Sequence, residues 1–139
     1  MSMLTLLLDT HTAIWLVRNE RVARAAEEAI NAVHETDGTL LVSPITAWEV
    51  GLLVSLRRLD LFATPQRWFA RLMSIPNVRA AELSPEILIA ASFLPGKPPR
   101  DPADRILLAT ARDLGATLVT RDRAILAYGE SGQVSTLAC

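Results

Sequence analysis

Short hydrophobic runs alternate along this chain with longer segments whose apolar residues recur at helical spacing. The runs have the length of buried strands and cover residues 4–8, 39–43, 78–83, 116–120 and 133–137, the last of them expected at an edge. The longer segments predict helices that begin near residue 12 and cover 21–33, 44–56, 61–73, 84–94, 101–114 and 124–127. Strands that alternate with helices predict an α/β fold, a three-layer α/β/α domain with a mostly parallel sheet of about five strands.

Length and composition predict one domain over residues 1–139. No apolar run approaches the roughly 18 residues of a membrane span, and no signal-peptide pattern is visible, so we expect a cytoplasmic protein without membrane contact. Cys139 is the only cysteine, which excludes an internal disulfide and a cysteine-based zinc site. The net charge of −1 and pI of about 6.1 provide no general attraction for nucleic acid, so any such binding must be local or assisted by metal ions. The mean hydropathy of +0.27 is high for a small monomer and suggests a covered apolar surface.

Four carboxylates occupy informative places, although each also has an ordinary structural explanation. Asp9 follows the first predicted strand and Asp122 the fourth, where either could cap the next helix. Asp104 lies in the first turn of a helix that Asp101 could cap, and the helix dipole favours an acid there. Glu49 shares a helical face with apolar residues, where a charge is unfavourable unless it is paired, bound to a metal or able to reach water.

Taken together, these acids predict a metal site. The carboxyl ends of parallel strands meet at one edge of a sheet, where ligand sites form, so the four side chains are expected to converge there. Clustered carboxylates repel one another, and an oxygen-only cluster suits Mg²⁺ or Mn²⁺. Such ions polarise phosphoryl oxygens and lower the pKa of bound water, which indicates chemistry on phosphate esters.

Positive side chains flank the last two acids. Arg100, Arg105, Arg121 and Arg123 could hold a phosphate backbone at the rim of the site, or could form ordinary ion pairs with the same acids. His11 could reach a substrate phosphate but is also a typical surface residue. We expect substrate contacts from Thr10, His11, Arg105 and Arg121.

Four motifs occur in the order seen in PIN-domain proteins, and the chain is most similar to VapC-like toxins of type II toxin–antitoxin systems. They are LLDTH at 7–11, SPITAWEV at 43–50, DPADRILLATA at 101–111 and LVTRD at 118–122. The resemblance implies a PIN-like fold and a Mg²⁺- or Mn²⁺-dependent ribonuclease that hydrolyses RNA. It further implies that Asp9, Glu49 and Asp104 bind the metal directly, and that Asp122 acts as a fourth acid through water.

The resemblance also implies two protein partners. One is a cognate VapB-like antitoxin whose C-terminal segment covers the active-site groove, and the other is a second copy of the chain in a homodimer. We expect the segment 61–73, together with the helix before it, to line an apolar groove for a partner helix through Trp48, Leu52, Trp68 and Phe69.

The chain departs from many relatives at two positions. Leu53 stands where a lysine often follows the glutamate, and Pro99 stands where a histidine often precedes the Arg-Asp-Pro segment. Neither position is a metal ligand in the family, so the acid set is intact, and the two departures bear on substrate contacts and RNA preference instead.

Two other functions fit an acidic cluster. A Mg²⁺-dependent phospho-acceptor domain needs a lysine near its aspartate after a strand, but the only lysine, Lys97, lies in a Pro-rich loop. A non-catalytic acid-rich binding module would use the same acids only as helix caps. A metal-binding test separates this module from the nuclease.

Overall fold

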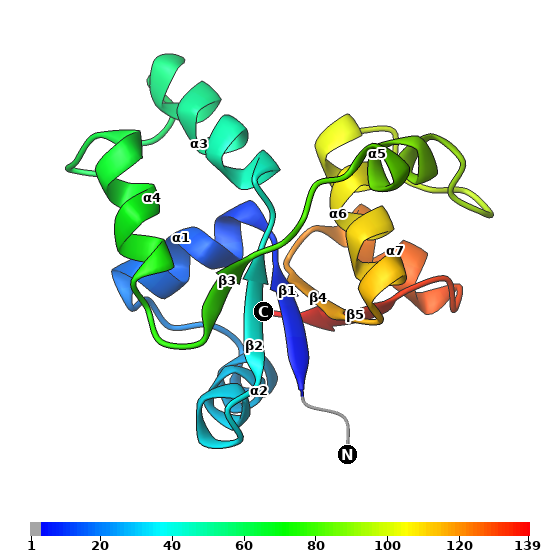
Figure 1. Cartoon of the computed structure of the whole chain (residues 1–139), viewed down its shortest axis with the longest axis horizontal. Coiled ribbons are helices and arrows are strands. Elements are labelled where there is room, and N and C mark those ends of the chain that lie inside the picture. The colour runs from blue at the N-terminus through cyan, green and yellow to red at the C-terminus, as the bar shows by residue number, and fades with distance from the viewer. Residues whose placement is uncertain (1–3) are drawn as a thin grey trace.

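The computed structural model describes residues 4–139, in which five parallel strands form one sheet (Figure 1). The strands are β1 (Thr5–Leu8), β2 (Thr39–Val42), β3 (Val78–Ala80), β4 (Thr117–Thr120) and β5 (Ser135–Ala138). Their order is β3-β2-β1-β4-β5, so β1 is central, and each neighbouring pair is parallel. The predicted α/β class and five-stranded sheet are confirmed, and the sheet is entirely parallel. Residues 1–3 of the expected domain lie outside the described residues.

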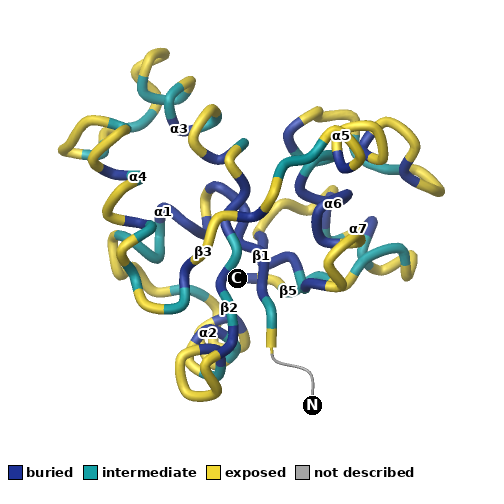
Figure 2. Tube along the Cα trace, in the orientation of Figure 1, coloured by how far each residue is buried: buried dark blue, intermediate teal, exposed yellow. Residues whose placement is uncertain are grey.

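Seven helices in the described residues pack around the sheet. They are α1 (Thr10–Arg18), α2 (Arg24–Glu35), α3 (Ile45–Ser55), α4 (Pro65–Met73), α5 (Pro85–Ser92), α6 (Pro102–Leu114) and α7 (Arg123–Glu130). In β1, Leu6 and Leu8 pack with α1, α2 and α4, whereas Leu7 faces α5, α6 and α7. Figure 2 shows the strands as the buried centre between these layers. The side chains of β1 alternate because successive residues of a strand point to opposite faces, which gives the α/β/α order.

Local signals set the helix boundaries and correct some expected ones. Asp9 caps α1, which is the structural role that the sequence allowed for it. The helix predicted over 61–73 begins only at Pro65, because the Thr64 side chain accepts a hydrogen bond from the Arg67 amide and a proline follows the cap. The helix predicted over 101–114 agrees with α6, which ends at Gly115 with φ of +62°.

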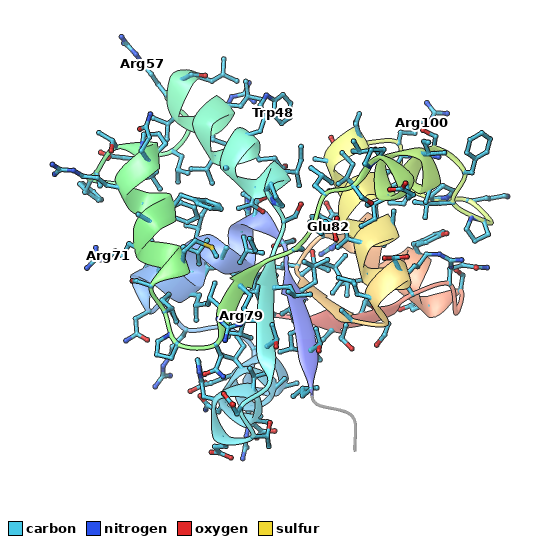
Figure 3. All side chains as sticks on the ribbon, viewed as in Figure 1. Trp48, Arg57, Arg71, Arg79, Glu82 and Arg100 are labelled. Atoms are coloured by element: carbon cyan, nitrogen blue, oxygen red, sulfur yellow. The ribbon has the colours of Figure 1, made fainter. Side chains whose placement is uncertain are left out.

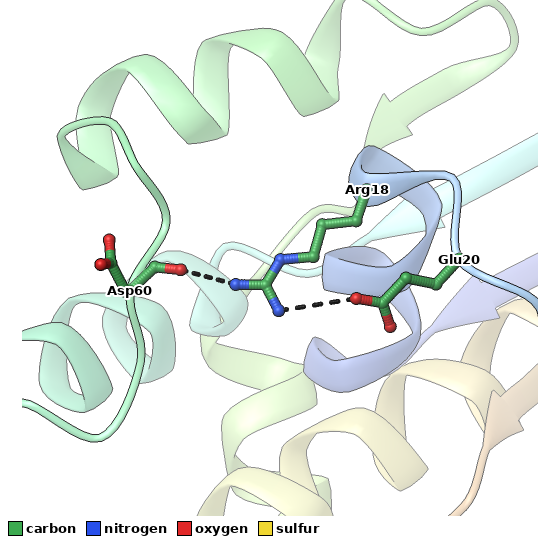
Figure 4. Close-up of polar contacts among 3 residues, drawn as sticks. All are labelled: Arg18, Glu20 and Asp60. Carbon is green, nitrogen blue, oxygen red and sulfur yellow. Dashed lines mark hydrogen bonds and ion pairs between the residues drawn. The ribbon is translucent and has the colours of Figure 1, made fainter.

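A polar link joins the end of α1 to the segment between α3 and α4. Nη2 of Arg18 donates a hydrogen bond of 2.6 Å to the Asp60 carbonyl, and Nη1 lies 3.7 Å from Glu20 Oε1 (Figure 4). α3 also packs against α1, α4 and α6. These contacts hold α3 beside the carboxyl end of the sheet, where the candidate site is found.

All helices of the fold are short. The longest, α6, has 13 residues, whereas a span of the bilayer needs about 20 predominantly apolar residues. None of the helices within residues 4–139 has the length and apolar character to cross a membrane.

Candidate active site

A cavity of about 560 Å³ lies at the carboxyl end of the sheet, and five carboxylates line it. The side chains come from the ends of β1 and β4 and from the helices α3 and α6. They are Asp9, Glu49, Asp101, Asp104 and Asp122. The structure therefore brings together the four acids predicted from the sequence and adds a fifth, Asp101.

Asp9 is buried and held by three hydroxyl or amide donors. The Thr12 amide and the Thr12 hydroxyl both lie 2.9 Å from Oδ1, and the Thr120 hydroxyl donates to Oδ2. Only 8% of Asp9 is exposed. Hydrogen bonds of this kind fix the orientation of the Asp9 side chain.

Thr120 also connects Asp9 to the turn that carries Asp122. The Thr120 hydroxyl oxygen accepts a hydrogen bond of 3.0 Å from the Asp122 amide. Oδ1 of Asp122 then caps α7 by accepting from the amides of Ala124 and Ile125. One buried hydroxyl therefore sets the spacing between the acids that follow β1 and β4.

Glu49 extends from α3 and meets Thr10 from the start of α1. The Thr10 hydroxyl donates a hydrogen bond of 2.5 Å to Glu49 Oε1, and it lies 3.3 Å from the Thr46 hydroxyl. Burial raises the pKa of Glu49 and outweighs the lowering effect of the Thr10 hydrogen bond, while the negative charges of Asp101 and Asp9 raise it further.

Asp104 is the most perturbed acid of the cavity. Burial, together with the negative charges of the four other carboxylates, raises its pKa to about 7, and Asp101 makes the largest contribution among these charges. Asp101 approaches closely because its Oδ2 caps α6 by accepting from the Asp104 amide at 2.9 Å. Within residues 4–139, no hydrogen bond or ion pair reaches the Asp104 carboxylate. The site therefore lacks positive charge where its negative charge is most crowded.

The donor chemistry of the cavity fits a hard divalent cation. All of its acidic ligands are oxygen donors, which Mg²⁺ and Mn²⁺ prefer over softer metals. A bound cation would relieve the repulsion that raises the pKa values of Asp104 and Glu49. In the described part of the chain, no three acidic, histidine or cysteine side chains are already arranged to hold an ion. Asp9, Glu49 and Asp122 each accept hydrogen bonds from hydroxyl or amide donors instead.

One wall of the cavity is aromatic and cationic. Arg121, which follows β4, lies over the ring of Trp15, with 4.0 Å between Cζ and the ring centroid. His11 meets the edge of the same indole ring at a centroid distance of 6.2 Å. Of the expected substrate contacts, Thr10, His11 and Arg121 line the cavity.

Arg105, the remaining expected substrate contact, is not part of the cavity lining. Its guanidinium donates to the carbonyls of Ala91, Ser92 and Pro99, which ties the start of α6 to the end of α5 and to the Pro-rich loop. Arg100 and Arg123 also lie outside the lining. The alternative that arginines pair with the acids is not found in the described residues, whose two ion pairs are Arg18–Glu20 and Arg24–Glu28.

The residues expected to contact a partner divide into two groups. Trp48 and Leu52 are 61% and 41% exposed on α3, and Figure 3 shows Trp48 projecting from that helix. Trp68 is only 3% exposed and packs in the core, and Phe69 is half-buried. Leu56, the residue that caps the end of α3, is also exposed and follows Leu52 by four residues. The exposed apolar surface is therefore on α3, and Trp68 of α4 belongs to the interior.

Several residues of the site were not singled out from the sequence. Asp101 was interpreted as a helix cap, and the structure gives it that role and a place in the cavity as well. Thr12 and Thr120 support Asp9 from positions beside the acid motifs, where a hydroxyl next to a strand-end aspartate is the only sequence signal. Trp15 follows the apolar pattern of its helix, so the sequence does not distinguish it from an ordinary core residue.

Comparison with known families and sequences gives two findings. A family model described as PIN domain matches residues 6–130. Ribonuclease VapC22 of Mycobacterium tuberculosis (strain ATCC 25618 / H37Rv) is 35% identical over 127 residues, which covers 91% of this chain and 93% of that protein.

Solved structures with a similar fold include VapBC2, FitAcB and a domain of a functionally unknown protein. VapBC2 from Rickettsia felis, bound to a DNA fragment from its promoter, has a TM-score of 0.64 at 13% identity and covers 97% of this chain and 98% of its own. A domain of a functionally unknown protein from Methanocaldococcus jannaschii has a TM-score of 0.60 at 16% identity, covering 97% and 90%. FitAcB from Neisseria gonorrhoeae has a TM-score of 0.53 at 17% identity, covering 95% and 96%. At these identities the likeness concerns the fold alone.

Proposed function

The chain belongs to the PIN-domain family, and on this basis we propose that it is a metal-dependent ribonuclease toxin neutralised by a VapB-like antitoxin. The observation that carries the proposal is the convergence of Asp9, Glu49, Asp104 and Asp122 on one cavity. The 35% identity to a ribonuclease over most of both chains supports the choice of RNA as substrate. The reaction is hydrolysis of a phosphodiester bond.

Asp9, Glu49 and Asp104 would hold Mg²⁺ or Mn²⁺, and Asp122 would act on it through water. When bound, such an ion lowers the pKa of water and stabilises negative charge on phosphoryl oxygens. Thr12 fixes the orientation of Asp9, and Thr10 that of Glu49. His11 and Arg121 contact the phosphate backbone of the RNA, whereas Arg105 keeps the first turn of α6 in place.

The exposed row of α3 supports the proposal of a protein partner. Trp48, Leu52 and Leu56 are spaced by four residues, so they form one apolar stripe along the helix. We assign this stripe to the antitoxin, which would lie over the mouth of the cavity. A homodimer would cover other apolar residues, such as Ile89 and Phe93 of the α5 region, which are 62% and 80% exposed. The toxin acts in the cytoplasm as one domain over residues 1–139.

The position of Lys97 favours the nuclease over a phospho-acceptor domain. Phospho-acceptor chemistry needs a lysine beside the aspartate, but Lys97 is exposed in the loop before α6 and is absent from the cavity lining. The same acids that cap helices also line the cavity. A binding module that used them only as caps would have no need for Asp104, which caps nothing in the described residues.

The direct test is RNA cleavage by the purified chain and its Asp104→Asn variant in the presence of Mg²⁺. We expect cleavage by the wild type, its loss on addition of EDTA, and no cleavage by the variant. Asp113→Asn is the matched control, because Asp113 is an exposed acid at the far end of the same helix and should leave cleavage unchanged. Cleavage by Asp104→Asn at the wild-type rate would refute the assignment.

A cellular experiment tests the toxin proposal separately. Expression of the wild-type chain should arrest growth and deplete RNA, whereas expression of Asp9→Asn should do neither. Metal binding without RNA cleavage or growth arrest would favour the binding module.

A further inference from the structure

Arg121 is unusual because it lies in the wall of an acidic cavity without pairing with an acid. Five carboxylates line the same cavity, yet the ion pairs of the described residues are two surface pairs elsewhere. A flexible arginine beside so many negative charges would normally approach one of them. A physical restraint must therefore hold its guanidinium away from the acids.

Two contacts supply this restraint. Nε of Arg121 donates a hydrogen bond of 2.8 Å to the Cys139 carbonyl of the segment after β5. The guanidinium also lies over the Trp15 ring at 4.0 Å, an arrangement that attracts a cation to the negative face of the indole. Trp15 is itself half-buried and packs against the core on the α1 side of the sheet, so its ring is held by neighbouring side chains.

These two contacts leave the terminal nitrogens of the Arg121 guanidinium without hydrogen-bond partners in the described part of the chain. Nε is the only nitrogen of Arg121 that donates to a residue in the described part of the chain, so Nη1 and Nη2 retain their four N–H donors. The side chain is exposed at the cavity wall. A planar pair of terminal nitrogens matches two oxygens of a phosphate group, which a lysine in this place would not do.

We propose that Trp15 and the Cys139 carbonyl hold Arg121 off the carboxylates so that its two terminal nitrogens bind a phosphodiester of the RNA substrate. Trp15 is a positioning residue in this arrangement, and Arg121 is the group that touches the substrate. The inference rests on the proposed ribonuclease function. It adds that the acids and the arginine of the cavity have separate roles. The acids attract cations, while one arginine is kept free for the anionic substrate.

The first experiment measures RNA binding without cleavage. The probe is a fluorescein-labelled single-stranded oligoribonucleotide, and its anisotropy is followed with the Asp104→Asn protein in Mg²⁺ over a range of salt concentrations. Adding Arg121→Gln should weaken binding about tenfold, the loss typical of one charged hydrogen bond. The slope of log affinity against log salt should become shallower by about 0.7, the value for one phosphate contact on a single strand.

Arg123→Gln is the matched control, because Arg123 is an exposed arginine two residues away and outside the cavity lining. Arg123→Gln should weaken RNA binding less than Arg121→Gln does, and it should change the salt slope less. Equal effects of Arg121→Gln and Arg123→Gln would overturn the proposal, and so would an Arg121→Gln protein that binds the probe with unchanged affinity and slope.

The second experiment tests the positioning role of Trp15. Trp15→Phe keeps an aromatic face and should bind the probe nearly as well as the parent, whereas Trp15→Leu should weaken binding and flatten the salt slope. In the Arg121→Gln background, Trp15→Leu should have no further effect, because the side chain that it positions is gone. A purely structural role would give additive losses.

Thermal melting of each variant checks that the fold is retained, and Trp15→Phe keeps the test valid if the leucine variant is unfolded. Loss of binding by Trp15→Phe equal to that of Trp15→Leu, or additive effects in the double variant, would overturn the positioning role. Because the readout is binding by a cleavage-deficient protein, failure of this inference leaves the cleavage test of the ribonuclease proposal unaffected.

Discussion

Replacing Asp104 by asparagine should stabilise the metal-free protein at neutral pH while it abolishes RNA cleavage. In the folded protein, burial and four neighbouring carboxylates raise the pKa of Asp104 from 3.8 to about 7. The folded state therefore binds a proton more tightly than the unfolded chain between these values. Stability falls as the pH rises through this window, and the full penalty is present above pH 7.

The size of the effect follows from the pKa shift and the exposure of the side chain. A shift of about 3 pKa units corresponds to about 4 kcal/mol at 1.36 kcal/mol per unit. Asp104 is partly exposed, so solvent screening reduces this upper bound. The dipole of α6 favours a charge in its first turn by about 0.3–1 kcal/mol, which asparagine loses. We expect Asp104→Asn to be more stable by about 1–2 kcal/mol above pH 7.

Urea unfolding in EDTA between pH 4 and pH 8 measures this difference. The difference between the two proteins should be small near pH 4, where Asp104 is protonated in the folded state and only partly ionised in the unfolded chain, and it should grow as the pH rises. Mg²⁺ should then stabilise the wild type much more than the variant, because a ligand that binds the native state adds stability by mass action. Asp113→Asn should show no such pH dependence. An Asp104→Asn protein that is less stable than the wild type at pH 8 in EDTA would refute the reasoning.

Three further substitutions test a side chain of the site, one of the α3 surface and one of the core. Thr120→Val keeps the side-chain shape but removes the hydroxyl between Asp9 and the Asp122 amide. It should lower the rate of RNA cleavage at least about tenfold, measured by kinetics, and lower the free energy of unfolding by about 1–3 kcal/mol, measured in urea. Wild-type kinetics would contradict a role for this hydroxyl. Trp48→Ala should change the free energy of unfolding by no more than about 0.5 kcal/mol but weaken binding of the cognate antitoxin, as measured by calorimetry. Trp68→Ala should lower the free energy of unfolding by about 3–5 kcal/mol, because Trp68 is buried and Trp48 is not. Unchanged antitoxin binding by Trp48→Ala would exclude the α3 stripe as its docking surface.

The arrangement of the acids was predictable because the sheet has one direction. A short apolar run that ends in an acid indicates where a strand stops, and parallel strands stop at the same edge. No side-chain contact has to be known for this prediction, and Asp9 and Asp122 line the same cavity in the structure. It extends to Glu49 because α3 begins directly after β2 and keeps the glutamate on the side facing α1.

The remaining details depend on contacts between distant segments. Trp68 and Trp48 look alike in the sequence, but the start of α4 at Pro65 turns Trp68 into the core while Trp48 stays on the surface. Arg105 stands beside an acid in the sequence, yet its guanidinium is fixed by carbonyls of α5 and the loop after it. Arg121 is restrained by Trp15, which lies more than a hundred residues earlier in the chain, and by the carbonyl of Cys139, which lies eighteen residues later. Local patterns carry no signal for such pairings.

The central place of β1 means that synthesis order limits when the toxin can become active. β1 is the first strand made, but one of its edges stays open until β4 at Thr117–Thr120 has left the ribosome. Asp104 and Asp122 are also translated after Asp9 and Glu49. A nascent chain that ends before β4 therefore lacks Asp122 and one neighbour of its middle strand, so the cavity at the carboxyl end of the sheet is complete only after β4 and the turn that follows it have been made.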